Sequence, residues 1–396
     1  MVQEMVAVLA LEDGATFTGR AFGGVAALAN GRRGEVVFAT SMTGYQEICT
    51  DPSYRGQMVV LTYPIIGSYG VAFGDDESRR PWLAALLVRE YCDEFSNWRA
   101  AGSLDDYLRR HGVPGVSELD TRALTRHLRA SGTLRGVLRA FAPGAAPDLA
   151  ALVAEARGVA PIAALDVVGE VVTKEPHPWR GGAPGTATAP PGARRGRARA
   201  LLVDTGFKHN IARSLHARGL EVIIAPAVTP ALLDQWQPDG VVLANGPGDP
   251  EAVPAVVELA RLLIERRIPL LGICLGHQVI ALAAGARTHR LPFGHHGSNH
   301  PVRAVRGGRV TITAQNHNFA VDGTSVDGAA GWYVSHVNLS DGSVEGLAHE
   351  ELPVFSVQFH PEAAPGPQDN QALFDQFAAL LAERPRVGGA RRVAAV

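Results

Sequence analysis

The sequence contains few cysteines and no long apolar segment. Its three cysteines, Cys49, Cys92 and Cys274, have no regular spacing, so neither a disulfide framework nor a cysteine-based zinc site is indicated. No apolar run approaches the length of a membrane span, and the first residues lack the basic and then apolar layout of a signal peptide. We therefore expect a cytoplasmic protein without a membrane partner.

Lysine is also nearly absent, and nucleotide-binding motifs are missing. Of the 37 lysines and arginines, Lys174 and Lys208 are the lysines, and the net charge at pH 7 is −2. A net charge so close to zero gives no electrostatic case for binding nucleic acid. The sequence has neither a phosphate loop of the form G-x-x-x-x-G-K-[ST] nor a dinucleotide-binding fingerprint. We therefore expect no nucleotide cofactor on this chain.

The most informative stretch is 269–278, where an apolar strand, a sharp turn at Cys274 and an apolar helix follow one another. Gly272 and Gly276 flank Cys274 as in a nucleophile elbow, with cysteine in place of serine. Glycine suits both positions because a side chain would clash where a strand turns abruptly into a helix. The N-terminus of that helix favours a thiolate. Taken alone, Cys274 could equally be a buried structural cysteine.

Length and composition predict two domains, since 396 residues can form two hydrophobic cores. Residues 1–176 mix hairpin and helix signals and predict an α+β domain. Residues 177–199 are rich in Pro, Gly, Ala, Thr and Arg and predict a linker, whose arginines we interpret as a solvated charge run. Residues 385–396 are expected to form a flexible tail.

Residues 200–384 alternate short apolar strands with helices, which predicts an open, mostly parallel α/β sheet flanked by helices. In such sheets ligands gather beyond the carboxyl ends of the strands. The strand 241–244 is followed by the tight loop 245–250, and the next strand is followed by Cys274. We therefore expect this loop and the cysteine to lie side by side.

A later strand, 354–359, ends at the sequence His360-Pro361-Glu362. Pro361 holds His360 in an extended conformation, and alternate residues of an extended segment point the same way. Glu362 can therefore orient the imidazole of His360. Together with the cysteine elbow, these residues predict a Cys274-His360-Glu362 triad.

These motifs resemble class I glutamine amidotransferases, and the first domain narrows the resemblance to the small subunits of carbamoyl-phosphate synthetase. The amidotransferase motifs are 245–250, 272–278 and 359–363. The segments that resemble the small subunits are 40–47, 50–54, 119–122, 294–301 and 315–321. The resemblance covers nearly the whole chain apart from the linker and the tail.

The resemblance implies roles for particular residues. Cys274 is then the nucleophile, His360 the base and Glu362 the orienting residue. The glutamine site would comprise Ser41, Gly246, Gly248, Leu275, Gln278, Asn316, Asn318 and Phe319. Without the resemblance, the segment around Ser41 reads as a solvated loop. Asn318 departs from the family pattern, which has glycine there, and asparagine would be the least disruptive replacement at a positive φ.

The resemblance implies no metal ion in this chain. His295, His296 and His300 are of a metal-binding type, but no carboxylate or cysteine stands at a useful spacing from them in the sequence. ATP and Mg²⁺ or Mn²⁺ are expected instead on a large subunit that forms a heterodimer with this chain. That subunit would receive ammonia through a protected tunnel and use bicarbonate to make carbamoyl phosphate for pyrimidine and arginine biosynthesis.

The expected reaction is hydrolysis of L-glutamine through a thioester on Cys274, with the oxyanion held by N–H groups of Leu275 and of the loop from Gly246 to Gly248. Two other classes stay open. A cysteine hydrolase acting on peptides or γ-glutamyl compounds would not need the Ser41 segment and would work without a partner. A non-catalytic scaffold would have lost a triad residue, and none is lost.

Overall fold

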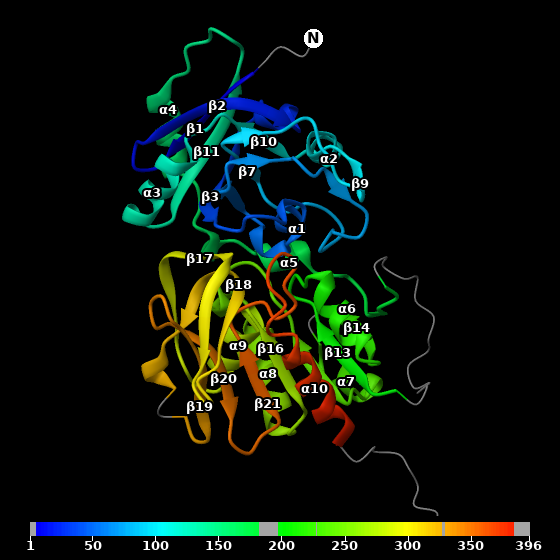
Figure 1. The fold of residues 1–396 in the computed structure, drawn as a ribbon. Helices are drawn as coiled ribbons and strands as arrows, with labels where there is room; N and C mark the ends of the chain where they lie inside the picture. The colour runs from blue at the N-terminus through cyan, green and yellow to red at the C-terminus, as the bar shows by residue number, and fades with distance from the viewer. Residues whose placement is uncertain (1–4, 182–196, 227, 327–328, 384–396) are drawn as a thin grey trace, which may run out of the picture.

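In a computed structural model the chain forms two domains stacked on one another (Figure 1). The structure describes residues 5–181, 197–226, 228–326 and 329–383. The predicted tail and most of the predicted linker lie outside these residues. No helix within the described ranges has the length and apolar character needed to cross a membrane.

The first domain is a closed barrel with strand order β1-β11-β3-β4-β7-β10-β2. The strands are β1 (Val6–Leu11), β2 (Thr16–Gly23), β3 (Arg32–Ala39), β4 (Gln57–Leu61), β7 (Ala85–Leu87), β10 (Pro114–Ser117) and β11 (Leu134–Phe141). β1 and β2 form the predicted hairpin, and β11 closes the barrel by pairing with both β1 and β3. The α+β composition was predicted, whereas the closure was not, because it depends on pairing between distant strands.

Helices with side-chain caps surround this barrel: α2 (Leu104–Arg110), α3 (Thr121–Ser131) and α4 (Leu149–Arg157). Ser103, Asp120 and Asp148 cap their N-termini, each by accepting a hydrogen bond from the N–H three residues later. The shorter α1 (Tyr45–Thr50) and α5 (Val167–Val171) lie near the second domain (Figure 1). Two small sheets, β5–β8 and β6–β9, complete the domain; their strands are Ile65–Ile66, Glu90–Tyr91, Val71–Ala72 and Ala100–Gly102.

The second domain is built on a sheet with order β12-β14-β13-β15-β16-β21-β20-β19-β17-β18. Its parallel part comprises β13 (Arg199–Val203), β14 (Glu221–Ala225), β15 (Gly240–Leu243), β16 (Leu270–Ile273) and β21 (Val354–Val357). The antiparallel part comprises β17 (Thr288–Ala304), β18 (Val310–Val321), β19 (Trp332–Asn338) and β20 (Val344–His349). The mostly parallel sheet is confirmed. Strand β17 was missed because its polar residues hide any alternating pattern.

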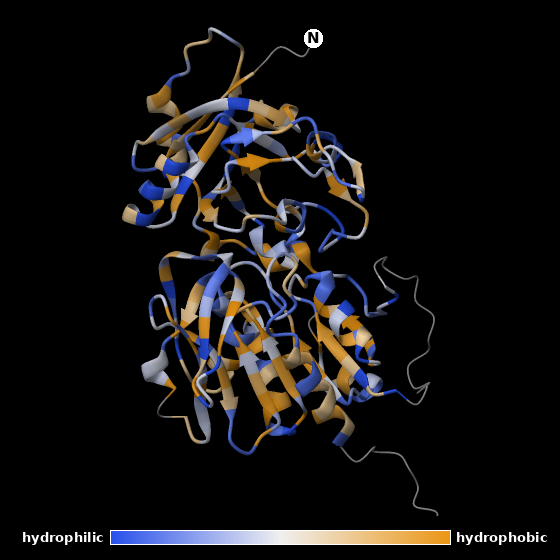
Figure 2. Ribbon diagram, in the orientation of Figure 1, coloured by the Kyte–Doolittle hydropathy of each residue, from blue (hydrophilic) through white to orange (hydrophobic). Residues whose placement is uncertain are grey.

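Helices cover both faces of the parallel strands, as predicted. Leu201 and Val203 pack into one core with α7 (Pro230–Trp236), α8 (Pro254–Glu265) and α9 (Leu275–Ala283). Ala200 and Leu202 point the other way and pack with α6 (His209–Ala217) and α10 (Ala372–Glu383). Because these strands are buried on both faces, most of their residues are apolar (Figure 2).

The start of the predicted linker belongs to the sheet. His177–Pro178 form β12 and pair with β14, and Trp179 is buried. A linker that begins at residue 177 is therefore wrong for these residues. A two-residue edge strand is too short to leave an alternating pattern in the sequence.

Candidate active site

Cys274 lies where β16 ends and α9 begins, in a strained backbone conformation. Its φ is 55° and its ψ is −105°, a costly combination for a residue with a side chain. A Cβ atom on Gly276 would lie 2.2 Å from the backbone oxygen of Leu243, and one on Gly272 would lie 2.6 Å from the oxygen of Gly276. Both glycines are therefore required by close backbone approach, and the predicted elbow is present.

His360 and Glu362 follow the end of β21 and are buried with Cys274. The N–H of His360 donates to the oxygen of Ala314 over 2.9 Å, and its Nδ1 lies 2.6 Å from Oε1 of Glu362. Burial lowers the pKa of His360, but the negative charges of Glu362 and Cys274 outweigh burial and raise it. The structure thus brings the three predicted residues together.

Cys274 and His360 do not form a hydrogen bond with each other. Nε2 of His360 is buried without a hydrogen-bond partner among the described residues, although Cys274 is near enough to act on its pKa. Sγ of Cys274 donates instead to the backbone oxygen of Asn316 over 3.5 Å. Catalytic hydrogen bonds often tighten when substrate binds, so this geometry is compatible with a catalytic pair.

Lys208, which was not among the predicted site residues, extends the triad. Its Nζ lies 3.2 Å from Oε1 of Glu362 and donates to the backbone oxygen of Ala363. Burial raises the pKa of Glu362, but the charges of Lys208 and His360 lower it below its ordinary value. Glu362 is therefore held as a carboxylate. The sequence did contain a signal that could have identified Lys208, since it is one of two lysines in the chain and follows an apolar strand.

The first domain reaches into the site through Asp51 and Ser53. Oδ2 of Asp51 accepts a hydrogen bond from Nδ2 of Asn316 over 2.7 Å. Nδ2 of Asn245 lies 3.0 Å from Oγ of Ser53 and 3.4 Å from Oδ1 of Asp51. All four side chains are buried, so the two domains share a polar seam beside the nucleophile.

Glu77, also from the first domain, forms a second part of this seam. Its Oε1 pairs with Arg213 over 2.6 Å, and its Oε2 accepts from the N–H of Asn210 over 2.9 Å. Burial lowers the pKa of Lys208, but the charges of Glu362 and Glu77 outweigh burial and raise it. The N-terminal turn of α6 is thus held by a carboxylate from the other domain.

The predicted loop and elbow lie side by side. The N–H of Gly276 donates to the oxygen of Ala244 over 3.0 Å, and a Cβ on Gly246 would lie 2.9 Å from the side chain of Leu275. Gly248 has a φ of 89°, which favours glycine. Leu275 is the first residue of α9, so its N–H has no partner within the helix.

The residues on α9 and β18 that were predicted to bind the substrate glutamine also lie close together. Nε2 of Gln278 donates to the oxygen of Phe319 over 2.8 Å. The Oδ1 atoms of Asn316 and Asn318 lie 2.9 and 3.1 Å from the two ring nitrogens of His296. Asn318 does not have the positive φ considered for it, because β18 stays extended through this position.

Ser41 is 7% exposed, so a solvated loop is the wrong description of its segment. Its Oγ lies 2.7 Å from Oγ of Ser298 on β17. The neighbouring Thr40 donates from its N–H to the oxygen of His296 over 3.1 Å. Ser41 therefore lies in the seam between the domains, against the strand pair that carries Asn316.

The sequence offers no carboxylate at a useful spacing from the histidines of β17, but the fold brings two carboxylates to His295. Nε2 of His295 lies 2.9 Å from Oδ2 of Asp341, and its Nδ1 lies 3.8 Å from Oε1 of Glu345. Both carboxylates are more than 40 residues away in the sequence. Only the pairing of β17, β19 and β20 brings them to His295.

Two protein-family models match the chain. The family model described as "Carbamoyl-phosphate synthase small chain, CPSase domain" matches residues 9–138, and that described as "Glutamine amidotransferase class-I" matches residues 201–380. Part of the chain also resembles the solved structure of a glutamine amidotransferase from Thermotoga maritima, with a TM-score of 0.37 and 16% identity over 48% of this chain and 99% of that chain.

Curated relatives match along nearly their full length. The carbamoyl phosphate synthase small chain of Symbiobacterium thermophilum is 50% identical, with 94% of this chain and 97% of the relative covered. Those of Syntrophotalea carbinolica and Bacillus caldolyticus are 48% and 46% identical, and cover 95% and 96% of this chain and 98% of each relative. The chain therefore belongs to the family of carbamoyl phosphate synthase small chains and carries a class I glutamine amidotransferase domain.

Proposed function

We propose that Cys274 is the nucleophile with which this small chain hydrolyses L-glutamine. The observation that carries the proposal is the buried line from Cys274 through His360 and Glu362 to Lys208. A strained cysteine at a helix N-terminus, facing an oriented imidazole, is suited to acyl transfer. A structural cysteine would need neither the strain nor the oriented base.

The reaction proceeds in two steps. The thiolate of Cys274 attacks the side-chain amide carbon of glutamine, and His360, which holds the proton of the thiol on Nε2, gives that proton to the departing ammonia. Water then attacks the thioester, gives a proton to His360 and releases glutamate as the proton returns to the sulfur. Glu362 holds Nδ1–H of His360, so Nε2 always faces the reacting atoms.

Backbone N–H groups of Leu275 and of the loop from Gly246 to Gly248 are the proposed oxyanion donors. One such donor is typically worth about 10²–10³ in rate. Gln278, Asn316, Asn318 and Phe319 would form the pocket for the rest of glutamine on the second domain. Ser41 would contribute a hydroxyl from the first domain.

We also propose that a large subunit uses the ammonia. That subunit would bind ATP and Mg²⁺ or Mn²⁺ and would form a cytoplasmic heterodimer with this chain to make carbamoyl phosphate. The absence of a phosphate loop or dinucleotide fingerprint from the sequence supports this division of labour. The first domain would dock the large subunit as well as supply Ser41.

The test is Cys274→Ser in the complex reconstituted with the large subunit. Synthesis of carbamoyl phosphate from glutamine should be lost, and synthesis from added ammonia should persist, because the synthetic step lies on the other chain. Loss of both activities in a correctly assembled complex would contradict this division. Cleavage of peptides or γ-glutamyl compounds by the purified chain alone would favour a cysteine hydrolase instead.

A further inference from the structure

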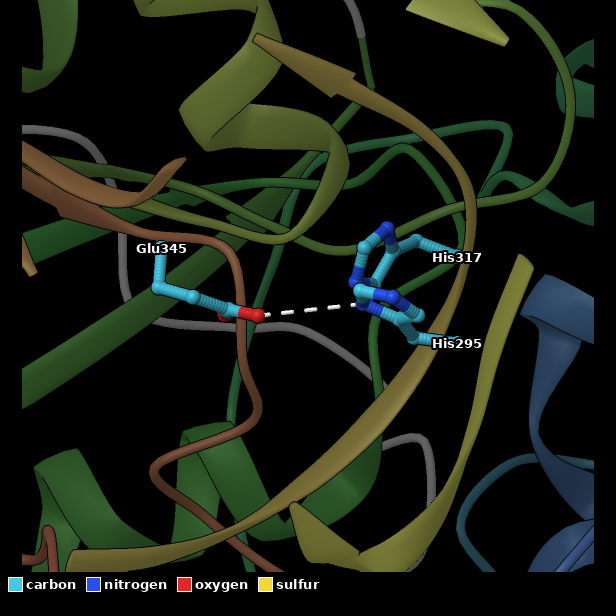
Figure 3. Close-up of side chains that lie close together, drawn as sticks. All are labelled: His295, His317 and Glu345. Carbon is cyan, nitrogen blue, oxygen red and sulfur yellow. Dashed lines mark ion pairs between the residues drawn. The ribbon is translucent and has the colours of Figure 1, made fainter. Parts of the chain in front are cut away.

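Three buried side chains outside the catalytic triad converge on one point in the second domain. They are His295 of β17, His317 of β18 and Glu345 of β20, and their ring nitrogens and carboxylate oxygen lie within 4.8 Å of one another. Figure 3 shows the carboxylate of Glu345 directed at the two imidazole rings. None of the three takes part in the proposed glutamine chemistry.

The inward nitrogen of His295 is an unpartnered polar atom. His295 is 7% exposed, and its Nδ1 is buried without a hydrogen bond among the described residues. Oε1 of Glu345 is 3.8 Å away, too far for a hydrogen bond. A buried nitrogen without a hydrogen bond lowers stability unless another group or an ion interacts with it.

The outward nitrogens of both rings are held as they are in metal sites. Nε2 of His295 lies 2.9 Å from a carboxylate oxygen of Asp341, and Nδ1 of His317 lies 2.8 Å from the backbone oxygen of Phe319. Such second partners fix the protonated nitrogen on the outside and turn a lone pair inward. Here the lone pairs belong to Nδ1 of His295 and Nε2 of His317.

The inward nitrogen of His317 then faces another acceptor. Nε2 of His317 lies 3.0 Å from Oε1 of Gln315, while Nε2 of Gln315 donates to Glu345 over 2.9 Å and so fixes the orientation of that amide. A neutral imidazole that donates through Nδ1 has no proton left for this contact. The lone pairs of Nε2 of His317 and Oε1 of Gln315 therefore repel one another. A cation bound by both atoms would replace this repulsion with attraction.

The charge of the cluster also favours a bound cation. Glu345 is fully buried and accepts hydrogen bonds from Asn338 over 2.7 Å and from Gln315, but within the described ranges no lysine or arginine pairs with it. A bound cation would stabilise the carboxylate as an anion.

We propose that His295, His317 and Glu345 bind one divalent transition-metal ion, for which zinc is the best fit. Two imidazole nitrogens and one carboxylate oxygen are ligands that zinc accepts, whereas magnesium and calcium prefer oxygen alone. Oε1 of Gln315 or a water molecule would take the fourth position. The side chain of Asp341, which lies beside His295, is 40% exposed. This assignment differs from the metal-free site expected from the sequence.

Metal titration of the full chain tests the assignment. Protein freed of metal with a chelator should bind one Zn²⁺, melt at a higher temperature with Zn²⁺, and give the visible absorption of tetrahedral Co²⁺ when Co²⁺ is added instead. Glu345→Gln keeps the size of the side chain and His295→Asn keeps a polar group, and each should weaken binding at least 100-fold. Asp341→Asn, which acts through His295, should weaken it about 10- to 100-fold.

The matched control is His300→Asn. The ring of His300 lies 5.1 Å from that of His295, but it is not one of the proposed ligands, so this variant should keep the metal. Wild-type protein without stoichiometric Zn²⁺, or Glu345→Gln binding as tightly as His300→Asn, would overturn the proposal. Unfolding measured in chelator shows whether each variant is folded. Because these readouts do not involve glutamine, they leave the proposed function unaffected either way.

Discussion

Replacing Glu362 by glutamine separates orientation of His360 from proton transfer. The same oxygen, Oε1, lies 2.6 Å from Nδ1 of His360 and 3.2 Å from Nζ of Lys208. Lys208 can only donate, so it should hold the amide oxygen of the introduced glutamine at that position. The amide would still accept from His360 and keep the productive tautomer.

The expected loss is therefore moderate. A charged hydrogen-bond partner is worth about 1.5–3 kcal/mol, so Glu362→Gln should lower kcat for glutamine hydrolysis about 10- to 150-fold. His360→Asn removes the proton carrier, so its kcat should fall close to that of Cys274→Ser. Lys208→Met combined with Glu362→Gln frees the amide to turn, and should lose far more activity than Glu362→Gln alone.

The assay is steady-state release of glutamate from glutamine, with unfolding in urea to confirm that each variant is folded. Equal losses for Glu362→Gln and His360→Asn would show that Glu362 does more than orient the ring. A double variant no worse than Glu362→Gln would show that Lys208 does not direct the amide. Either result would refute this account of the triad.

Further predictions concern the pocket, the elbow and acid stability. Ser41→Ala should raise the KM for glutamine about 2- to 10-fold, with a smaller effect on ammonia-dependent synthesis, because one hydroxyl contact is worth about 0.5–1.5 kcal/mol; an unchanged KM would place Ser41 outside the pocket. Gly276→Ala should lower the free energy of unfolding in urea by about 1–3 kcal/mol, because its Cβ would lie 2.2 Å from the oxygen of Leu243; wild-type stability would contradict this. Burial lowers the pKa of His277 to about 3, so the unfolded state binds more protons between pH 3 and 6.5 and stability falls as the pH drops through that range. His277→Asn should reduce the slope of the unfolding free energy against pH by up to about 1.4 kcal/mol per pH unit. An unchanged slope would mean that His277 is not buried as a neutral ring.

The parts of the site that could be predicted from sequence depend on local geometry. A strand that turns into a helix at Cys274 needs small neighbours, and Gly272 and Gly276 record that need in the sequence. His360 and Glu362 are two residues apart in an extended segment, so their contact follows from backbone geometry alone. The alternation of apolar strands and helices likewise predicted the parallel sheet.

The parts that could not be predicted depend on distant pairings. Asp51 meets Asn316 across 265 positions, and no local pattern marks either as a partner of the other. Glu345 lies beside His295 because β17 and β20 both flank β19. Strand β17 itself carries a polar motif in place of an alternating one, so the register that makes these contacts leaves no trace in the sequence.

The polar seam limits how the two domains can be recombined. A second domain cut off near residue 200 would leave Arg213 without Glu77, and Asn245 and Asn316 without Asp51 and Ser53. A first domain transplanted from a distant relative would have to bring the same donors and acceptors at the same positions, since buried unpaired groups are costly. Engineering this enzyme by domain exchange therefore requires that the residues on both sides of the seam be exchanged together.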